Sequence, residues 1–250
     1  MAGHNKWSKV KHIKARVDAV KGRVFSKCAH EIALAARAGG GDPQLNSRLR
    51  TAIENAKAVS TPRENIERAI KKGTGELGGA AIQEVTYEGY GPNGIAFLIE
   101  TATDNLNRTA QDIRTIFSKN NGTPATPGSV SYQFDRKGQV ILVAPHASEE
   151  EIFESAIMAG ADDVQSDETE HTIYCPAAQL AAVASQLRLS GYHVTSEKFI
   201  SIPQIPRYIE DLSTARQCLK LYDLFDAYDD TLNVFTNFEL SDEILAQLDN

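Results

Sequence analysis

The chain has 250 residues, of which 42% are apolar, and its formal net charge is −7. This length favours two or three domains, and no apolar stretch reaches the roughly 20 residues that cross a bilayer. Three cysteines, an odd number without a C-x-x-C pair, argue against a disulfide framework and against a zinc site. The basic N-terminus is not followed by the apolar segment of a secretion signal. We therefore expect a cytoplasmic protein with no membrane partner.

Positive charge is concentrated at the N-terminal end. Residues 1–78 carry 16 Lys and Arg against 7 Asp and Glu, whereas residues 79–250 carry 10 against 26. Within the first thirty residues, Asp18 is the one acidic residue among eight cations: Lys6, Lys9, Lys11, Lys14, Arg16, Lys21, Arg23 and Lys27. Clustered like charges repel unless a partner of opposite sign relieves them, so we predict that these eight residues contact the phosphates of a nucleic acid. The alternative is an ordinary solvated helix face.

Two other residues near these cations allow more than one interpretation. Trp7, the only tryptophan, can stack on a base or anchor the basic arm to the helical domain. His30 follows Lys27 by three residues and can extend the basic strip on the same helix.

Residues 15–73 have the periodicity of three helices. Apolar residues recur at steps of three and four from Val17 to Ala35, and again over residues 49–59 and 66–70. The Gly39-Gly40-Gly41 triplet ends the first helix, and Asp42 with Pro43 predicts the start of the second. Thr61 to Glu64 predicts a capping box at the start of the third, with Pro62 in its first turn. The three stripes can be buried only against one another.

The rest of the chain alternates between strands and helices. Strands are predicted around residues 85–87, 95–100 and 129–134, with a helix at 106–117. From residue 139 the predicted order is strand 139–144, helix 149–159, strand 163–166, strand 172–175, helix 177–190 and strand 193–199. This β-α-β-β-α-β order is that of a ferredoxin-like unit. A helix at 215–226 and a strand at 233–238 join the strands and helix predicted at residues 85–134, which gives a second set of four strands and two helices.

The predicted fold class is therefore α+β, with an N-terminal three-helix domain followed by two ferredoxin-like α+β domains, one inserted in the other. The predicted boundaries are 1–78 for the basic arm and helical domain, 79–136 plus 203–250 for the discontinuous domain, and 137–202 for the inserted domain.

Catalytic motifs are not found in the sequence. The glycine triplet lacks the Lys-Ser/Thr of a phosphate loop, and neither G-x-S-x-G nor H-E-x-x-H occurs. The Asp104 to Thr109 segment is rich in residues that cap a helix start, although Arg108 could instead bind an anion there. We predict a protein that is not an enzyme, with no catalytic residue, no cofactor and no metal site.

Five separated motifs carry a resemblance to a known family. They are Met1 to Ser8 (MAGHNKWS), Gly39 to Pro43 (GGGDP), Tyr87 to Pro92 (YEGYGP), Thr103 to Thr109 (TDNLNRT) and Pro127 to Val130 (PGSV). In this order they resemble the YebC/PmpR family from end to end, with Asn5 standing where serine is usual. The resemblance implies a three-domain α+β protein described as a probable transcriptional regulator with DNA-binding activity, whereas mitochondrial relatives are translational activators.

Three functions are compatible with these observations. We predict a transcriptional regulator that binds DNA phosphates through its arm and helical domain. The alternative is a translation factor that binds ribosomal or messenger RNA through the same residues. A third possibility is a protein-interaction module whose basic arm binds an acidic partner. In each case the acidic domains can bind a protein partner of their own. Composition does not separate DNA from RNA, because phosphate contacts dominate the affinity for both.

Overall fold

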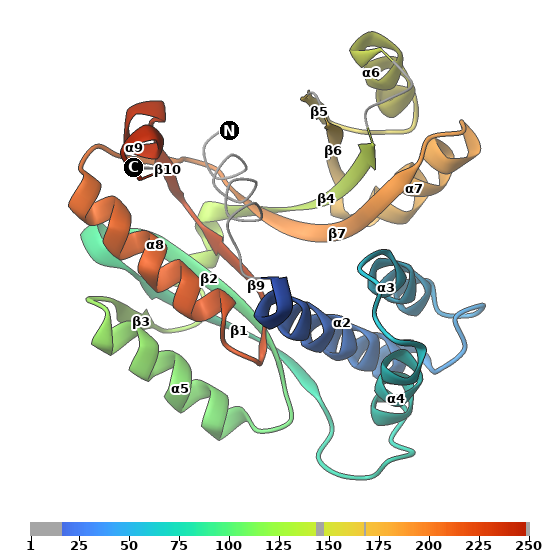
Figure 1. The fold of residues 1–250 in the computed structure, drawn as a ribbon, viewed down its shortest axis with the longest axis horizontal. Coiled ribbons are helices and arrows are strands. Elements are labelled where there is room, and N and C mark those ends of the chain that lie inside the picture. Colours follow the sequence, from blue (N-terminus) through green and yellow to red (C-terminus); the bar gives the residue numbers. More distant parts are fainter. Residues whose placement is uncertain (1–16, 144–147, 168, 249–250) are drawn as a thin grey trace. The chain divides into compact units, whose positions relative to one another are not determined.

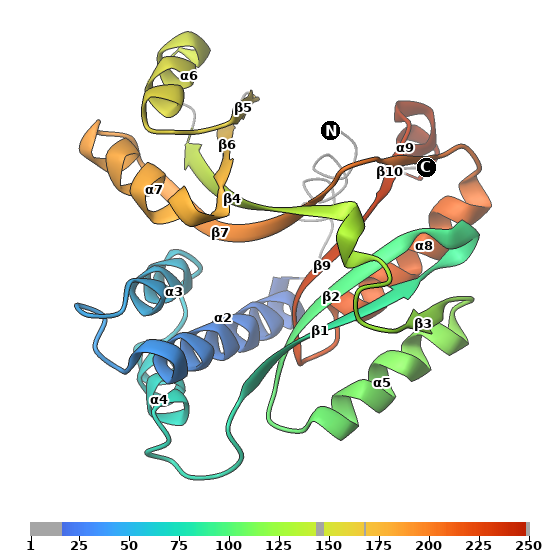
Figure 2. The same cartoon turned by 180° about the vertical axis from the view of Figure 1, so that it is seen from behind.

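The protein forms two compact units (Figures 1 and 2). The computed structural model describes residues 17–143, 148–167 and 169–248. One unit takes the chain up to Phe134 and again from Pro203 onward, and the other spans Asp135–Ile202. Each unit combines helices with a four-stranded sheet, which confirms the predicted α+β fold class. The finer division into three domains at the boundaries given above stays a prediction. In the described part of the chain, no helix is long and apolar enough to span a bilayer.

Three helices open the first unit, as predicted. They are α2 (Val17–Gly39), α3 (Ser47–Ala58) and α4 (Arg63–Gly73). Their shared core consists of Ile32, Ala35, Ala36, Leu49, Ala52, Ala56, Ile66 and Ala69, which are all buried. Small side chains dominate this core, so the helices can approach one another closely. Helix α2 continues through Gly22 without a break.

The start of α3 differs from the prediction. Helix α3 begins at Ser47, and Asn46 is its N-cap, because the Asn46 side chain accepts a hydrogen bond from the Leu49 amide at 3.0 Å. The same side chain donates to the carbonyl oxygens of Ala35 and Gly40 at 2.7 and 2.9 Å. Asp42 instead closes a turn by accepting from the Gln44 amide at 2.9 Å. Asn46 is the better cap because it satisfies three backbone groups from a buried position.

The capping box predicted at Thr61 is also wrong. Pro62 has an extended backbone (φ −58°, ψ 141°) and occupies the position before the first helical residue, and no side chain caps α4. The helix therefore begins one residue later than predicted, and its N-cap position is held by Pro62, whose side chain has no hydrogen-bond acceptor.

The sheet of the first unit has the strand order β3-β1-β2-β9. Its strands are β1 (Gln83–Tyr90), β2 (Ala96–Thr103), β3 (Thr123–Ala125) and β9 (Thr231–Thr236). Strand β2 is buried along its whole length. On one face, Phe97 of β2 packs with Phe117 and Phe225, whose rings lie 4.6 to 6.3 Å apart by centroid. These phenylalanines come from α5 (Leu106–Lys119) and α8 (Leu212–Asp226), so both helices cover that face.

Helix α2 packs on the same sheet through a separate cluster. Ala33 and Leu34 of α2 are buried against Ile82 and Ala102, close to the edge where β2 pairs with β9. Both figures show α2 alongside β2 and β9. Because α2 contributes to the helical core and to this cluster, it connects the helices to the sheet.

Three short elements complete the first unit and were not predicted. Strand β8 (Arg207–Ile209) pairs in parallel with β10 (Phe238–Leu240), and α9 (Asp242–Leu248) follows. Each has seven residues or fewer, too short to show a clear periodicity.

The second unit has the predicted β-α-β-β-α-β order. Its elements are β4 (Phe134–Val143), α6 (Glu149–Met158), β5 (Asp163–Ser166), β6 (Glu170–Pro176), α7 (Leu180–Leu189) and β7 (Val194–Pro203). The strand order β5-β6-β4-β7 is that of the ferredoxin-like fold. Both helices pack on one face of this sheet, where Ile152 of α6 and Val183 of α7 meet Val140 and Ile173.

The strand predicted over Ser129 to Phe134 is wrong. Residues 131–133 form a 3-10 turn, and β1 pairs on the side away from β2 with β3, at residues 123–125. The reason is the buried carboxylate of Glu88, which accepts hydrogen bonds from the amides of Gly128 (2.7 Å), Val130 (2.6 Å) and Ser131 (3.0 Å). Amides that donate to Glu88 are not available for a strand ladder. Burial alone would raise the pKa of Glu88, but the three amide donors outweigh it and hold the pKa below its usual range.

We expect the Glu88→Gln variant to unfold more easily than the wild-type protein at pH 7, by about 1.5 to 3 kcal/mol. The reason is that an amide side chain presents one acceptor where the carboxylate presents two. Because the folded-state pKa of Glu88 is lowered, its contribution is complete above the unfolded-state pKa and is lost as the pH falls through the folded-state pKa. The difference between the two proteins should therefore shrink in urea unfolding followed by circular dichroism as the pH is lowered below about 4.3. A difference that stays constant down to acidic pH would contradict this explanation.

Candidate nucleic-acid interface

The predicted phosphate-binding residues fall into two groups. Lys6, Lys9, Lys11, Lys14 and Arg16 lie outside the described residues, as does Trp7. Lys21, Arg23 and Lys27 belong to α2. Arg23 is exposed, and Lys27 lies one turn further along the same side of the helix.

Lys27 forms an ion pair with another residue of the protein. Its Nζ lies 2.6 Å from Oδ1 of Asp226, and both side chains are partly buried, with 25% and 32% of their surface exposed. This ion pair joins α2 to the last residue of α8, which is 199 positions away in the sequence. The charge of Lys27 is therefore balanced by Asp226, and a phosphate would have to compete with that carboxylate.

His30 does not extend the basic strip. Burial is the largest influence on His30 and lowers its pKa, against the opposing effect of nearby carboxylates such as Asp230. A histidine with a lowered pKa is neutral at pH 7. His30 therefore carries no charge that could attract a phosphate at that pH.

Two further cations of the helical region also bind carboxylates of the first unit. Arg48 of α3 pairs with Glu31 of α2 at 2.9 Å and with Glu84 of β1 at 3.1 Å. Although burial alone would lower the pKa of Arg48, these two carboxylates raise it. Lys72 of α4 lies 3.2 Å from Asp104, which follows β2. These pairs hold the helices against the sheet and offer little to an external anion.

A second set of cations faces solvent and was not singled out by the sequence. It consists of Arg50, Lys57, Arg68 and Lys71, which we call the α3/α4 cations. All four side chains are exposed, and none has an ion pair or hydrogen bond with another residue in the described ranges. Arg50 and Lys57 are two turns apart on α3, and Arg68 and Lys71 are one turn apart on α4. The signal available in the sequence was their position outside the apolar stripes, which predicts exposure.

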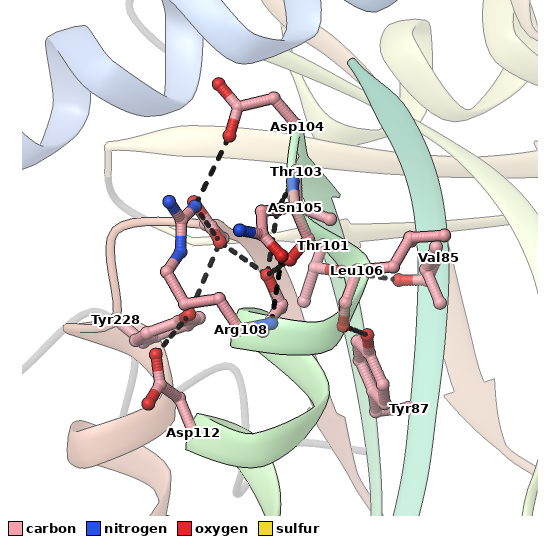
Figure 3. A network of polar contacts seen from close by, with 12 residues as sticks. Val85, Tyr87, Thr101, Thr103, Asp104, Asn105, Leu106, Arg108, Asp112 and Tyr228 are labelled. Carbon is pink, nitrogen blue, oxygen red and sulfur yellow. Dashed lines mark hydrogen bonds and ion pairs between the residues drawn. The ribbon is translucent and has the colours of Figure 1, made fainter. Parts of the chain in front are cut away.

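The Asp104 to Thr109 segment forms an internal polar network, drawn in Figure 3. Asn105 caps α5 by accepting from the Arg108 amide at 3.1 Å. The Arg108 guanidinium lies 3.0 and 3.3 Å from the two carboxylate oxygens of Asp230, just before β9. Thr109 donates to Asp230 at 2.6 Å. Arg108 thus neutralises a buried carboxylate, and the capping interpretation of this segment accounts for its composition.

Tyr228 also belongs to this network and connects Asp230 to Asp112. The Tyr228 hydroxyl donates to Asp112 at 2.9 Å and lies 3.3 Å from Asp230. Burial is the main reason that the pKa of Tyr228 rises to about 12. Burial would raise the pKa of Asp230 as well, but the hydrogen bonds from Thr109 and Arg108 outweigh it and lower that pKa. The carboxylate therefore stays charged and the phenol stays protonated at neutral pH. In the ranges that the structure describes, no group of His, Cys, Asp and Glu side chains is arranged to hold a metal ion.

Comparison with known proteins identifies relatives over nearly the whole chain. The family model of the TACO1/YebC protein N-terminal domain matches residues 5–76, and that of the TACO1/YebC second and third domain matches residues 82–238. A protein of Akkermansia muciniphila named "Probable transcriptional regulatory protein" is 57% identical over 250 residues, covering 99% of this chain and all of the relative. A protein of Aquifex aeolicus with the same name is 45% identical over 248 residues, covering 99% and 100%.

A solved structure agrees with these relatives. The crystal structure of a conserved hypothetical protein from Aquifex aeolicus superposes with a TM-score of 0.86 at 45% identity, covering 93% of this chain and 96% of the other. The name of that protein assigns it no activity. Two family models, close relatives and a solved structure agree with the resemblance seen in the five sequence motifs, and the chain belongs to the TACO1/YebC family.

Proposed function

We propose that this protein is a non-enzymatic regulator of transcription that binds DNA through phosphate contacts made by its N-terminal arm and its helical region. The observation that carries this proposal is the distribution of charge: residues 1–78 have a net charge of +9, whereas residues 79–250 have −16. A basic surface on an otherwise acidic protein is the electrostatic pattern of a nucleic-acid-binding protein. The relatives named as probable transcriptional regulatory proteins support the regulatory role.

The structure divides the cations of the helices by their contacts. Lys27, Arg48 and Lys72 pair with carboxylates of the first unit, whereas the α3/α4 cations point into solvent without such partners in the described ranges. When a cation binds a phosphate, counterions are released from the nucleic acid, and this release favours binding. A cation that already pairs with a carboxylate must first break that ion pair, so unpaired cations bind phosphate more favourably. We therefore assign the phosphate contacts of the helical region to Arg50, Lys57, Arg68 and Lys71.

The test compares two neutralised variants of the full chain. One replaces Lys6, Lys9, Lys11, Lys14 and Arg16 with Gln, and the other replaces the four α3/α4 cations with Gln. Affinity for a labelled 30-base-pair DNA duplex is measured by fluorescence anisotropy between 50 and 200 mM salt. We expect each variant to bind roughly 10- to 100-fold more weakly, and the slope of log affinity against log salt to fall by roughly 0.9 for each lost phosphate contact.

The matched control replaces four other exposed cations: Arg114, Lys119, Arg216 and Lys220. They lie on α5 and α8, and their replacement by Gln changes the net charge as much as the α3/α4 variant does. If the control weakens binding as strongly as the α3/α4 variant, net charge alone explains the effect and the assigned surface is wrong. If wild type and both variants bound the DNA duplex with equal affinity, the proposed interface would be wrong. If the protein bound RNA or ribosomes much more tightly than DNA at equal salt, the result would favour regulation of translation over regulation of transcription.

A further inference from the structure

The outer face of α6 in the second unit carries large apolar side chains in contact with solvent. Ile152 and Ala156 point into the core and are fully buried. On the other side of the helix, Phe153 is 48% exposed, Ile157 43% and Met158 88%. Phe153 and Ile157 are four residues apart, so their side chains are neighbours on the helix surface. The core of the unit is complete without them.

Helix α7 of the same unit offers a comparison. Its inner residues Val183 and Leu187 are buried, and its exposed middle turns carry only small or polar residues such as Ala181, Ser185 and Gln186. Both helices lie on the same face of one sheet, so the outer face of each helix is exposed to water (Figure 1). An exposed phenylalanine beside an exposed isoleucine is therefore a particular feature of α6, and such exposed apolar clusters mark interaction sites.

Negative charge surrounds these apolar side chains. Glu149, Glu150 and Glu154 are exposed, and none of the three has a hydrogen bond or ion pair within the described ranges. Glu150 precedes Phe153 by three residues, and Glu154 precedes Ile157 by three, so the carboxylates flank the apolar pair. Glu151 differs from them because it completes the capping box with Ser148. The sequence from residue 135 to 202 contains 11 acidic and 4 basic residues, so the surrounding unit adds to the negative potential.

We propose that this face, defined by Glu149, Glu150, Phe153, Glu154, Ile157 and Met158, binds a basic, partly apolar segment of a second protein. Apolar side chains of the partner cover Phe153 and Ile157, and its lysines and arginines pair with the three glutamates. Charge complementarity selects this partner: a nucleic acid would be repelled by the carboxylates. A second copy docking through the same face would place the glutamates of both copies together, because a twofold interface brings like surfaces into contact. The inference is independent of the proposed nucleic-acid contacts.

The test uses defined peptides with the full-length protein. A fluorescein-labelled 16-residue helical peptide carries leucines along one face and lysines on both flanks, and a matched peptide has glutamate in place of each lysine. Anisotropy is measured for wild type, for Phe153→Ala with Ile157→Ala, and for Glu149, Glu150 and Glu154 all replaced by Gln. We expect the lysine peptide to bind wild type and to bind each variant at least about tenfold more weakly.

Two control variants keep the result specific. Leu189→Ala removes another exposed apolar side chain of the same unit, 81% exposed at the end of α7. Glu210→Gln, Asp229→Asn and Glu243→Gln together remove three exposed acidic charges outside the unit. Both should bind like wild type. The proposal is overturned if the α6 variants bind the lysine peptide as tightly as wild type, or if the glutamate peptide binds equally well. Sedimentation velocity that shows a wild-type dimer lost in Phe153→Ala with Ile157→Ala would assign the face to a second copy and also overturn it.

Discussion

Replacing Asp230 with Asn is expected to lower the free energy of unfolding by about 2 to 4 kcal/mol. The Asp230 side chain is 10% exposed and accepts hydrogen bonds from Arg108 and Thr109. Asparagine keeps the shape but carries no charge, and it presents an amide group to one of these donors. Arg108 then keeps only the longer contact with Asp104, at 3.5 Å, and half of its side chain remains in contact with water, which limits the loss. Urea unfolding at pH 7, followed by circular dichroism, measures the change.

The adjacent residue provides the control. Asp229 is exposed, and its side chain has no hydrogen bond or ion pair with the described residues, so Asp229→Asn should change stability by less than about 0.5 kcal/mol. Because the folded-state pKa of Asp230 is lowered, its contribution is present above the unfolded-state pKa and is lost as the pH falls. The Asp230→Asn difference should therefore shrink below about pH 3.9. Equal effects of the two substitutions would show that the network does not stabilise the fold.

A methyl group at Gly73 is expected to separate α4 from α2 and to destabilise the protein by about 3 kcal/mol. A Cβ atom added there would overlap the carbonyl oxygen of Ala33 and lie 2.8 Å from Cβ of Ala36. Both neighbours belong to α2, and a backbone oxygen cannot rotate away as a flexible side chain can. Gly73→Ala should therefore lower the urea midpoint and, by loosening the helices, also weaken DNA binding. Circular dichroism and the anisotropy assay measure these two effects.

Gly22→Ala is the matched substitution in the same group of helices. Apart from its chain neighbours and the nearby backbone of α2, no described atom lies within 4 Å of a Cβ at Gly22, which is an exposed position inside α2. Alanine is a better helix former than glycine by about 1 kcal/mol, so this variant should be slightly more stable than wild type. If Gly73→Ala were as stable as Gly22→Ala, close packing between α2 and α4 would not be a requirement of the fold.

The cations of the helical region differ in their contacts with the rest of the protein. Lys27 pairs with Asp226 of α8, Arg48 pairs with Glu84 of β1, and Lys72 pairs with Asp104, which directly follows β2. Each pair is partly exposed, so each contributes modestly to stability. The α3/α4 cations have no such partner in the described ranges, and the proposed function assigns the phosphate contacts to them.

The main elements of the fold were predictable because their signals are local. The apolar stripe from Val17 to Ala35 predicts α2, and the alternation of short apolar runs after residue 138 predicts the β-α-β-β-α-β order of the second unit. Two wrong predictions have non-local causes. Asp42 has the composition of a helix cap, but the cap of α3 is Asn46, which is held by its contacts with Ala35 and Gly40 of the preceding helix and turn. The strand predicted at residues 129–134 does not form because amides in this segment donate to Glu88 of β1.

Periodicity, motifs and charge can be read along the chain, and they were enough to predict the α+β class, the three helices, the family and the separation of a basic N-terminal region from an acidic remainder. Which charges pair with one another became visible in the folded protein alone. Lys27 meets Asp226 across 199 positions, Arg108 meets Asp230 across 122, and Glu88 meets the Val130 amide across 42. Hydrogen bonds and ion pairs act over a few ångströms in space, and folding brings these distant residues together in ways that local patterns do not specify.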